Sequence, residues 1–309
     1  MGTRVSVLMP AYNEADNLAE LVPQVAAVLD RVGESYEIVV VDDGSTDGTR
    51  GVMQGLRSPT VRYIRLRRNA GKSAGLSLGL EHVRDEYVVL MDADGQDDPE
   101  EVPRLLHHLE AEHLDLVTGR RAVRNDRFVK RTTSKLYNGV TAAVTGVPGK
   151  DFNSGLKAMT RELADTLEMY GELHRYIPVL AVWNGFRTGE LDVEHHERRH
   201  GTSKFGRARF WRGFLDLVTV KFLTTYTARP FHLFGGIGFA IGLVGGVLLA
   251  WMGVSKLTGH DIGTRPALQL GVLLVVVAVQ MLSLGLLGEL MVNLRRRRNL
   301  DAIGEGDLA

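Results

Sequence analysis

Strand-like and helix-like patterns alternate over the first 118 residues of this 309-residue chain. Short apolar runs rich in β-branched residues, beginning with Val5–Met9 and Ile38–Val41, are separated by longer segments with a helical period. In the first such segment, 13–31, four apolar residues share one helical face: Leu18, Leu21, Val25 and Leu29. This alternation predicts an α/β fold with a mostly parallel sheet, helices on both of its faces and right-handed crossovers.

The remaining expected elements continue the pattern, and polar residues gather where the strands end. They are helices at 46–56, 71–83 and 99–112, and strands at 61–66, 88–91 and 114–118. The polar strand ends are Tyr12-Asn13-Glu14, Asp42-Asp43, Arg68-Asn69 and Gly119-Arg120, together with the aspartates after residue 91. Parallel strands end at one edge of a sheet, where α/β proteins bind their ligands. A structural role alone gives no reason for this convergence, so it favours a binding site.

The strand at 88–91 is followed by four carboxylates within seven residues, from Asp92 to Asp98. Asp92 and Asp94 can both approach one hard cation such as Mg²⁺, which prefers carboxylate oxygens together with those of a bound phosphate. The alternative is a solvated turn in which Pro99 opens the next helix. An isolated pair of aspartates does not decide between these two interpretations.

Several cationic segments suggest contacts with phosphate. Gly71-Lys72-Ser73 resembles the end of a P-loop, but Leu66 stands where that motif requires glycine. We therefore expect Lys72 to meet a phosphate only as a point charge. The basic segment 120–135 fits a solvated surface as well as a phosphate-binding one, whereas Arg198–Lys204 places glycine and hydroxyls beside cations and favours an anion.

Histidine and cysteine usage narrows the chemistry further. Four histidines form adjacent pairs, which do not face together in a strand or a helix, and we interpret them as surface or structural residues, not as metal ligands: His107, His108, His195 and His196. Cysteine is absent, which excludes disulfides, thiolate catalysis and Cys-ligated zinc and fits a reducing compartment. The 37 basic residues balance 37 acidic ones, so no overall field predicts nucleic-acid binding. No signal peptide precedes the first strand.

Two segments, Leu233–Val254 and Ala267–Gly288, contain no charged residue and have the length that crosses a bilayer core. Basic residues precede the first span and follow the second, at Arg295–Arg298, which predicts that both termini, and with them the N-terminal α/β domain, lie in the cytoplasm. Three glycines four residues apart permit close helix packing and leave homo-oligomerisation through the spans open: Gly238, Gly242 and Gly246.

The region before the spans, 205–229, combines an aromatic stripe with basic residues, which is typical of a helix lying in a membrane interface. Packing on the soluble core is the alternative. We therefore expect an α/β domain at 1–204, an interface region at 205–229, a two-helix membrane domain at 230–294 with spans at about 232–254 and 267–292, and a basic cytoplasmic tail at 295–309.

These motifs together resemble the family 2 glycosyltransferases of GT-A fold, of the polyprenyl-phosphate type that includes dolichol-phosphate mannose synthases and GtrB-like enzymes. The matching motifs are Pro10–Glu14, Val41–Ser45, Asp92–Gln96, Thr118–Arg120 and Arg198–Lys204. The resemblance implies Mg²⁺ or Mn²⁺ held by Asp92, Asp94 and Gln96. It implies nucleotide-sugar binding by Pro10, Ala11, Tyr12, Glu14, Asp42, Asp43, Lys72, Asp92 and Ala93.

The resemblance also implies residues for the reaction and for the acceptor. Catalytic roles fall to Asp94, Arg120 and Asp151, the last at the position of an aspartate proposed as a base. Acceptor-phosphate binding falls to Arg120, Arg131, Ser134, Arg199 and Lys204. Two positions depart from the family pattern: Gly95 replaces a leucine, which should loosen the loop, and Lys157 replaces an arginine, which removes bidentate phosphate binding.

The implied reaction moves a single sugar from a UDP- or GDP-sugar to a membrane polyprenyl phosphate, with inversion. The Q-x-x-R-W motif of processive synthases is missing, which favours single transfer. One alternative is a membrane-anchored scaffold with a degenerate transferase domain, which the intact Asp92, Asp94 and Gln96 speak against. Another is a flippase-like role, for which two spans are few.

Overall fold

The computed structural model describes residues 4–33, 35–121, 138–149, 151–196, 219, 221–222, 230–259 and 266–303. The chain forms two compact units, Met1–Val220 and Lys221–Ala309. Most of the expected interface region lies outside the described residues. So do four predicted acceptor residues, Arg131, Ser134, Arg199 and Lys204.

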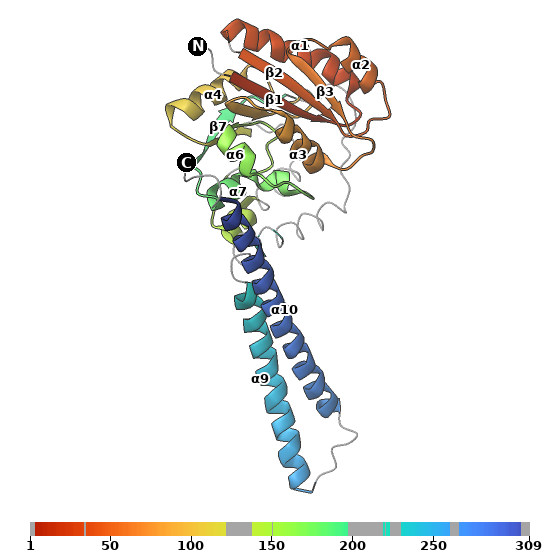
Figure 1. The fold of residues 1–309 in the computed structure, drawn as a ribbon, viewed down its shortest axis with the longest axis vertical. Helices are drawn as coiled ribbons and strands as arrows, with labels where there is room; N and C mark the ends of the chain where they lie inside the picture. Colours follow the sequence, from red (N-terminus) through yellow and green to blue (C-terminus); the bar gives the residue numbers. More distant parts are fainter. Residues whose placement is uncertain are drawn as a thin grey trace. The chain divides into compact units, whose positions relative to one another are not determined.

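The first unit is built on a seven-stranded sheet of order β3-β2-β1-β4-β6-β5-β7 (Figure 1). The strands are β1 (Arg4–Ala11), β2 (Ser35–Asp42), β3 (Val61–Arg65), β4 (Tyr87–Leu90), β5 (Leu116–Arg121), β6 (Lys157–Thr160) and β7 (Thr188–Val193). Among these seven, β6 alone runs antiparallel to its neighbours β4 and β5. The predicted α/β fold with a mostly parallel sheet is confirmed. The strand before Asp92, expected to be parallel, is so only on its β1 side.

Helices cover both faces of this sheet, as the alternation predicted. They are α1 (Ala15–Val32), α2 (Thr49–Gly55), α3 (Lys72–His82), α4 (Glu101–Ala111), α6 (Arg161–Thr166), η1 (Leu173–Tyr176) and α7 (Ile177–Trp183). Apolar residues of α1 and α4 share one buried cluster with alternate residues of the central strands, such as Val7 and Met9. Leu8 points to the opposite face, where it packs against Gly79 of α3. The carboxyl ends of the strands are thus fixed by two packed layers.

Because β6 runs antiparallel to β4, its first residues lie at the polar edge of the sheet. In the register between β4 and β6, Leu90 pairs with Lys157. The first residues of β6 therefore lie beside the last residues of β4, directly next to Asp92. A strand pattern read in chain order could not reveal this, because β6 is reached only after residues 122–156.

The second unit contains two long apolar helices, α9 (Pro230–Leu257) and α10 (Pro266–Ile303), which pack side by side (Figure 1). The segments Pro230–Leu257 and Pro266–Val292 each contain an 18-residue stretch, of mean hydropathy 2.2 and 2.6 respectively, and are long enough to cross a membrane. They correspond to the two predicted spans. The helix α10 continues through the four arginines of the expected basic tail as far as Ile303.

Glycines of α9 form the contact between the two helices. A Cβ at Gly238, Gly242 or Gly245 would lie 2.9–3.2 Å from atoms of α10, whereas one at Gly246 would meet nothing within 4 Å. The third member of the predicted stripe, Gly246, therefore does not contact α10 within the chain. Seven residues return to nearly the same helical face, but eight do not, because the helix has 3.6 residues per turn. Two of the three predicted glycines are used for packing within the chain.

We expect a disulfide to form between cysteines placed at Gly242 and Ala278. A Cβ at Gly242 would lie 3.2 Å from that of Ala278, close to the separation that a disulfide requires. The chain has no native cysteine, so oxidation in membranes yields an unambiguous product. Cleavage at a protease site engineered at residues 260–265 should leave the two fragments linked. The pair Gly246→Cys with Ala278→Cys should separate, and linkage there would contradict the packing.

Candidate active site

An ion pair stands at the centre of the polar edge. The ammonium of Lys72, the first residue of α3, contacts a carboxylate oxygen of Asp92, two residues beyond β4. Both side chains remain 33% exposed, so ions and ligands in solvent can reach them. Two of the residues that the sequence placed in the site are thereby brought together from separate strand ends.

The backbone before β6 presses against the same carboxylate. A Cβ at Gly155 would lie 2.4 Å from Cγ of Asp92 and 2.5 Å from one of its oxygens. No larger residue fits without moving the carboxylate, since non-bonded carbon atoms prefer separations of about 3.5–4.0 Å. Gly155 thus fixes the position of Asp92, a role that sequence analysis missed because it depends on the antiparallel strand.

Charged residues near this pair affect the pKa of Asp92. Lys157 is buried and donates a hydrogen bond to the carbonyl of Ser154, and burial, followed by the nearby charge of Lys72, lowers the pKa of Lys157 to about 8. Burial tends to raise the pKa of Asp92, but the charge and hydrogen bond of Lys72, together with the charge of Lys157, outweigh it, and that pKa is lowered. Asp92 is therefore a carboxylate at neutral pH.

His174 of η1 is a neighbour that the sequence analysis did not find. Its Nδ1 lies 2.9 Å from the hydroxyl of Ser73, and its backbone N–H donates to the same hydroxyl at 3.4 Å. Burial, followed by the charges of Lys72 and Arg175, lowers the pKa of His174 to about 2, so the ring is neutral. His174 holds the start of α3, which carries Lys72. A single histidine about 100 residues from its partner leaves no recognisable pattern.

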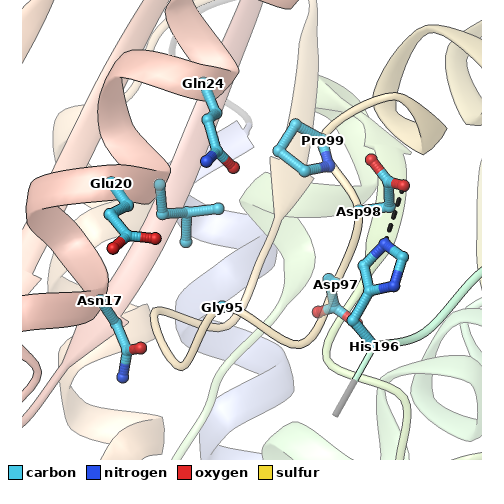
Figure 2. A pocket seen from close by; sticks show the side chains of 9 residues that line it. Asn17, Glu20, Gln24, Gly95, Asp97, Asp98, Pro99 and His196 are labelled. Atoms are coloured by element: carbon cyan, nitrogen blue, oxygen red, sulfur yellow. Dashed lines mark hydrogen bonds and ion pairs between the residues drawn. The ribbon is translucent and has the colours of Figure 1, made fainter. Parts of the chain in front are cut away.

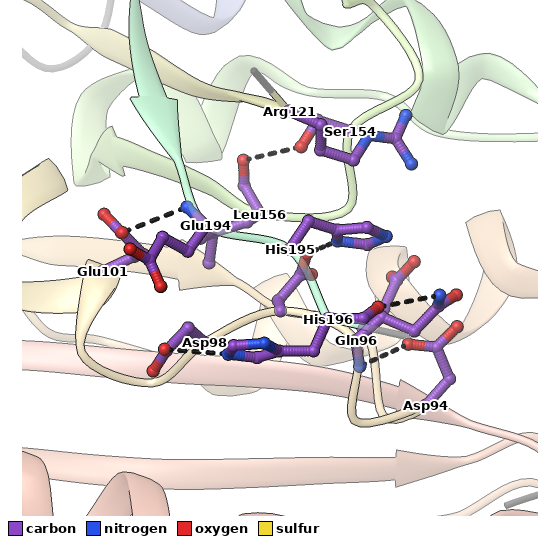
Figure 3. Close-up of polar contacts among 12 residues, drawn as sticks. Asp94, Gln96, Asp98, Glu101, Arg121, Ser154, Leu156, Glu194, His195 and His196 are labelled. Atoms are coloured by element: carbon purple, nitrogen blue, oxygen red, sulfur yellow. Dashed lines mark hydrogen bonds and ion pairs between the residues drawn. The ribbon is translucent and has the colours of Figure 1, made fainter. Parts of the chain in front are cut away.

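The predicted metal motif forms a turn clasped by the chain after β7 (Figure 3). Asp94 Oδ1 accepts the backbone N–H of Gln96 at 3.2 Å. The side-chain amide of Gln96 donates to the carbonyl of His196 at 3.2 Å, and His196 N–H donates to the carbonyl of Gln96 at 2.8 Å. The loop bearing Asp94 and Gln96 is thus ordered by a segment about 100 residues away.

The two histidines of that segment each face an aspartate. His195 lies 3.2 Å from Asp97 and His196 lies 3.0 Å from Asp98. The potential ligand atoms of His196, Asp98 and Glu194 lie within 4.8 Å of one another, a spacing that could accommodate an ion. Sequence analysis gave these histidines structural roles, and the carboxylate partners supply contacts of that kind.

A shallow pocket of about 160 Å³ lies behind this loop, between α1 and the residues that follow Asp94 (Figure 2). Its lining is mostly polar: Asn17, Glu20, Leu21, Gln24, Gly95, Asp97, Asp98, Pro99 and His196. Gly95 has φ +70°, a conformation that favours glycine. The glycine that the sequence analysis expected to loosen the motif therefore suits its turn.

The predicted nucleotide-binding loops are tied together by their own side chains. Asp42 accepts the N–H of Ser45 at 2.7 Å and also contacts Tyr63 and Arg65. Asp43 accepts the N–H groups of Ala70 and Gly71 at 2.6 and 2.8 Å. These aspartates position the loops, the second of them directly before Lys72, and their contact with a nucleotide stays a prediction. Pro10, Tyr12 and Glu14 are half-buried at the same edge, while Ala11 and Ala93 are buried.

Arg120 and Arg121 at the end of β5 have different partners. Arg120 pairs with Asp192 and lies 3.9 Å from Glu190. Arg121 donates two hydrogen bonds to Asp151, at 2.7 and 2.8 Å, and its charge also interacts with Asp97 and Asp92. Successive strand residues point to opposite faces. Arg121, which the sequence analysis did not single out, is the arginine that shares the environment of Asp92.

Asp151 is buried, and Arg121 occupies both of its carboxylate oxygens. This arrangement holds the guanidinium of Arg121 toward the aspartates. The predicted roles of Arg120 as a catalytic residue and Asp151 as a base stay predictions.

The sequence and the fold of this chain resemble those of known proteins. The family model described as "Glycosyl transferase family 2" matches residues 6–172, more than half of the chain. The chain belongs to glycosyltransferase family 2. The match includes every strand from β1 to β6 and the whole Lys72–Asp92 site.

Curated relatives extend this similarity to nearly the full chain. The dodecaprenyl-phosphate galacturonate synthase of Rhizobium johnstonii is 37% identical over 294 residues, covering 93% of this chain and 87% of that protein. The undecaprenyl-phosphate 4-deoxy-4-formamido-L-arabinose transferase of Edwardsiella ictaluri is 35% identical over 289 residues, covering 92% of this chain and 87% of that protein. This glycosyltransferase is therefore similar to such enzymes beyond its catalytic domain.

Solved structures support the fold. Glucosyl-3-phosphoglycerate synthase from Mycobacterium tuberculosis superposes with a TM-score of 0.57 at 20% identity, covering 72% of this chain and 80% of that one. A second structure of that enzyme, which contains Mn²⁺, UDP and glucosyl-3-phosphoglycerate, has a TM-score of 0.55 at 22% identity, with the same coverage. The predicted GT-A fold of the glycosyltransferase is thereby confirmed.

Proposed function

We propose that this glycosyltransferase moves one sugar from a nucleoside diphosphate sugar to the phosphate of a membrane polyprenol. The observation that carries this proposal is the extent of the similarity to polyprenyl-phosphate enzymes. The 7% of the chain that the first relative leaves unmatched is shorter than either candidate span, so the similarity must enter both. A soluble acceptor would give no reason for the relatives to share these helices.

The chain offers suitable ligands for Mg²⁺ or Mn²⁺. Asp92 and Asp94 supply carboxylate oxygens, and the amide nitrogen of Gln96 is engaged by His196, which leaves its oxygen to turn toward a cation. Hard divalent ions prefer such oxygen ligands. When bound, the ion would neutralise charge on the departing diphosphate.

The other residues supply cationic surroundings for two anionic substrates. Lys72, Arg121 and Lys157 bring three positive charges to the carboxylates of Asp92 and Asp151. These cations offset repulsion between the donor diphosphate and the acceptor phosphate. An acceptor oxygen attacks the anomeric carbon as the bond from that carbon to the diphosphate breaks. Nucleoside diphosphate leaves with the electron pair, and the configuration at the anomeric carbon is inverted.

This reaction does not need a general base, because the attacking phosphate oxygen is already anionic. We infer that Asp151 acts on the site through Arg121, whose guanidinium it holds with two hydrogen bonds. Bidentate pairs of this kind fix orientation as well as charge. Loss of Asp151 should therefore weaken substrate binding as Arg121 moves.

The proposed enzyme acts at the cytoplasmic face of a membrane. Basic residues precede the first span and follow the second, and the positive-inside rule then places both termini and the catalytic domain in the cytoplasm. Anchoring restricts the site to the surface that presents the lipid phosphate, which raises its effective concentration.

One experiment tests the function directly. Membranes that contain the enzyme are incubated with a panel of radiolabelled UDP- and GDP-sugars plus undecaprenyl phosphate, and the lipid fraction is extracted. We expect label from one donor in the lipid, released by mild acid and abolished by EDTA. Labelling that resists EDTA would contradict the metal assignment, and absence of lipid label with all donors would contradict the reaction.

We expect Arg199→Ala and Lys204→Ala to raise the KM for polyprenyl phosphate by about tenfold or more while changing donor affinity little. Each loses a charge-assisted contact with phosphate, worth about 1.5–3 kcal/mol. Titrating donor and acceptor separately measures the two effects. An equal loss of affinity for donor and acceptor would show that the segment 198–204 binds the donor or supports the fold.

A further inference from the structure

The Lys72–Asp92 pair puts a protein cation at the position where a divalent ion would bind. Asp92 is the first carboxylate of the proposed metal site, and the ammonium of Lys72 contacts one of its oxygens. Gly155 packs against the same carboxylate, which limits where a second cation could approach. Lysine and metal ion therefore compete for the same side of Asp92.

We propose that Lys72 is a resident counter-ion of the metal site. Its ammonium occupies Asp92 until a divalent ion displaces it, and the released ammonium then binds the donor diphosphate. This inference rests on the proposed function, because it presupposes that a metal–nucleotide complex enters the site. It gives Lys72 two successive anionic partners.

The chain holds the backbone of Lys72 still while its side chain remains able to move. Asp43 accepts the N–H groups of Ala70 and Gly71, just before Lys72. His174 holds Ser73, just after it. Lysine carries its charge on a flexible four-carbon stem, and this side chain is one-third exposed. The exchange thus requires rotation of one side chain rather than movement of a loop.

Electrostatics explain why such a counter-ion is useful. Asp92 is recessed against the backbone of Gly155, and a recessed carboxylate without a cation is costly. Lys157 cannot replace Lys72 as its direct partner, because the Lys157 ammonium is buried and donates to the carbonyl of Ser154. Lys72 keeps the metal-free site ordered, and its displacement makes metal binding weaker than the carboxylates alone would allow.

Mn²⁺ binding to the full-length protein in detergent, followed by electron paramagnetic resonance of the free ion, tests this exchange. Lys72→Met removes the competitor, so we expect Mn²⁺ alone to bind about tenfold more tightly than in the wild type. Binding of UDP or GDP in the presence of Mn²⁺ should weaken by about tenfold, because the diphosphate loses its ammonium. Lys72→Arg, which keeps the charge, should bind Mn²⁺ as the wild type does.

Arg187→Met is the matched control, since it removes one charge at the start of β7, at the opposite end of the strands, where Arg187 pairs with Asp115. It should change neither affinity. Unchanged or weaker Mn²⁺ binding by Lys72→Met would overturn the inference and leave the proposed function intact. Failure of the wild type to bind Mn²⁺ with either nucleotide would instead overturn the metal-dependent function, and the inference with it.

A second measurement uses the wild-type protein and does not depend on the variant folding. Acetic anhydride modifies lysines, and mass spectrometry measures the rate at each one. Mn²⁺ alone should raise the rate of acetylation at Lys72 by about threefold or more, because the ion releases the ammonium from Asp92, while Lys256 in α9 should react at a constant rate. No change at Lys72 at saturating Mn²⁺ would overturn the exchange.

Discussion

Replacing Asp94 by alanine should reduce sugar transfer by about a thousandfold or more while leaving the catalytic domain folded. A ligand of a catalytic metal ion accounts for several kcal/mol of transition-state stabilisation, and each 1.36 kcal/mol corresponds to a factor of ten in rate. The expected loss of folding stability is small by comparison. Asp94 is half-buried, and its hydrogen bond to Gln96 N–H is worth about 1 kcal/mol. Lipid labelling and thermal unfolding measure the two effects.

Asp165→Ala is a suitable control for this substitution. Asp165 forms an i,i+4 ion pair with Arg161 on the surface of α6, and such exposed pairs contribute little. Transfer by this variant should match that of the wild type. If Asp94→Ala retained full transfer, or lost it only through unfolding, Asp94 would not be a metal ligand.

Local sequence patterns were sufficient for the strands, the helices and the polar edge. Strands β1 and β2 each contain a continuous apolar run, Val7–Met9 and Ile38–Val41, and the helix between them, α1, carries a clear apolar face. Because parallel strands end together, Asp42, Asp43 and Asp92 could be placed at one edge before their distances were known. The two spans follow from composition alone.

The residues that complete the site could not be predicted in this way. Gly155 and Lys157 reach Asp92 only because β6 enters the sheet antiparallel, which depends on pairing rather than on a local pattern. His174 meets Ser73 from a short 3₁₀ turn that has no periodicity of its own. The family resemblance pointed to Arg120 rather than Arg121. In the strand these two side chains point to opposite faces, so Arg120 pairs with Asp192 and Arg121 with Asp151.

Gly155→Ala should lower transfer by about a hundredfold without unfolding the enzyme. The new methyl group would lie 2.4 Å from Cγ of Asp92, so the carboxylate must move by about 1 Å to restore a normal contact. Misplacement of a reacting group by that distance can cost about a hundredfold in rate. The side chain of Asp92 can rotate toward solvent, since it is one-third exposed, which spares the fold.

Metal affinity distinguishes displacement of Asp92 from a general packing defect. Gly155→Ala should weaken Mn²⁺ binding as well as transfer, because both depend on the position of the same carboxylate. Gly51→Ala is the matched control: this glycine lies in α2, and an added Cβ meets nothing within 4 Å. It should keep full transfer and gain a little stability from the better helix propensity of alanine. If Gly155→Ala transferred sugar and bound Mn²⁺ as well as Gly51→Ala does, the backbone before β6 would have no part in holding Asp92, and the placement of the carboxylate would have to come from Lys72 alone.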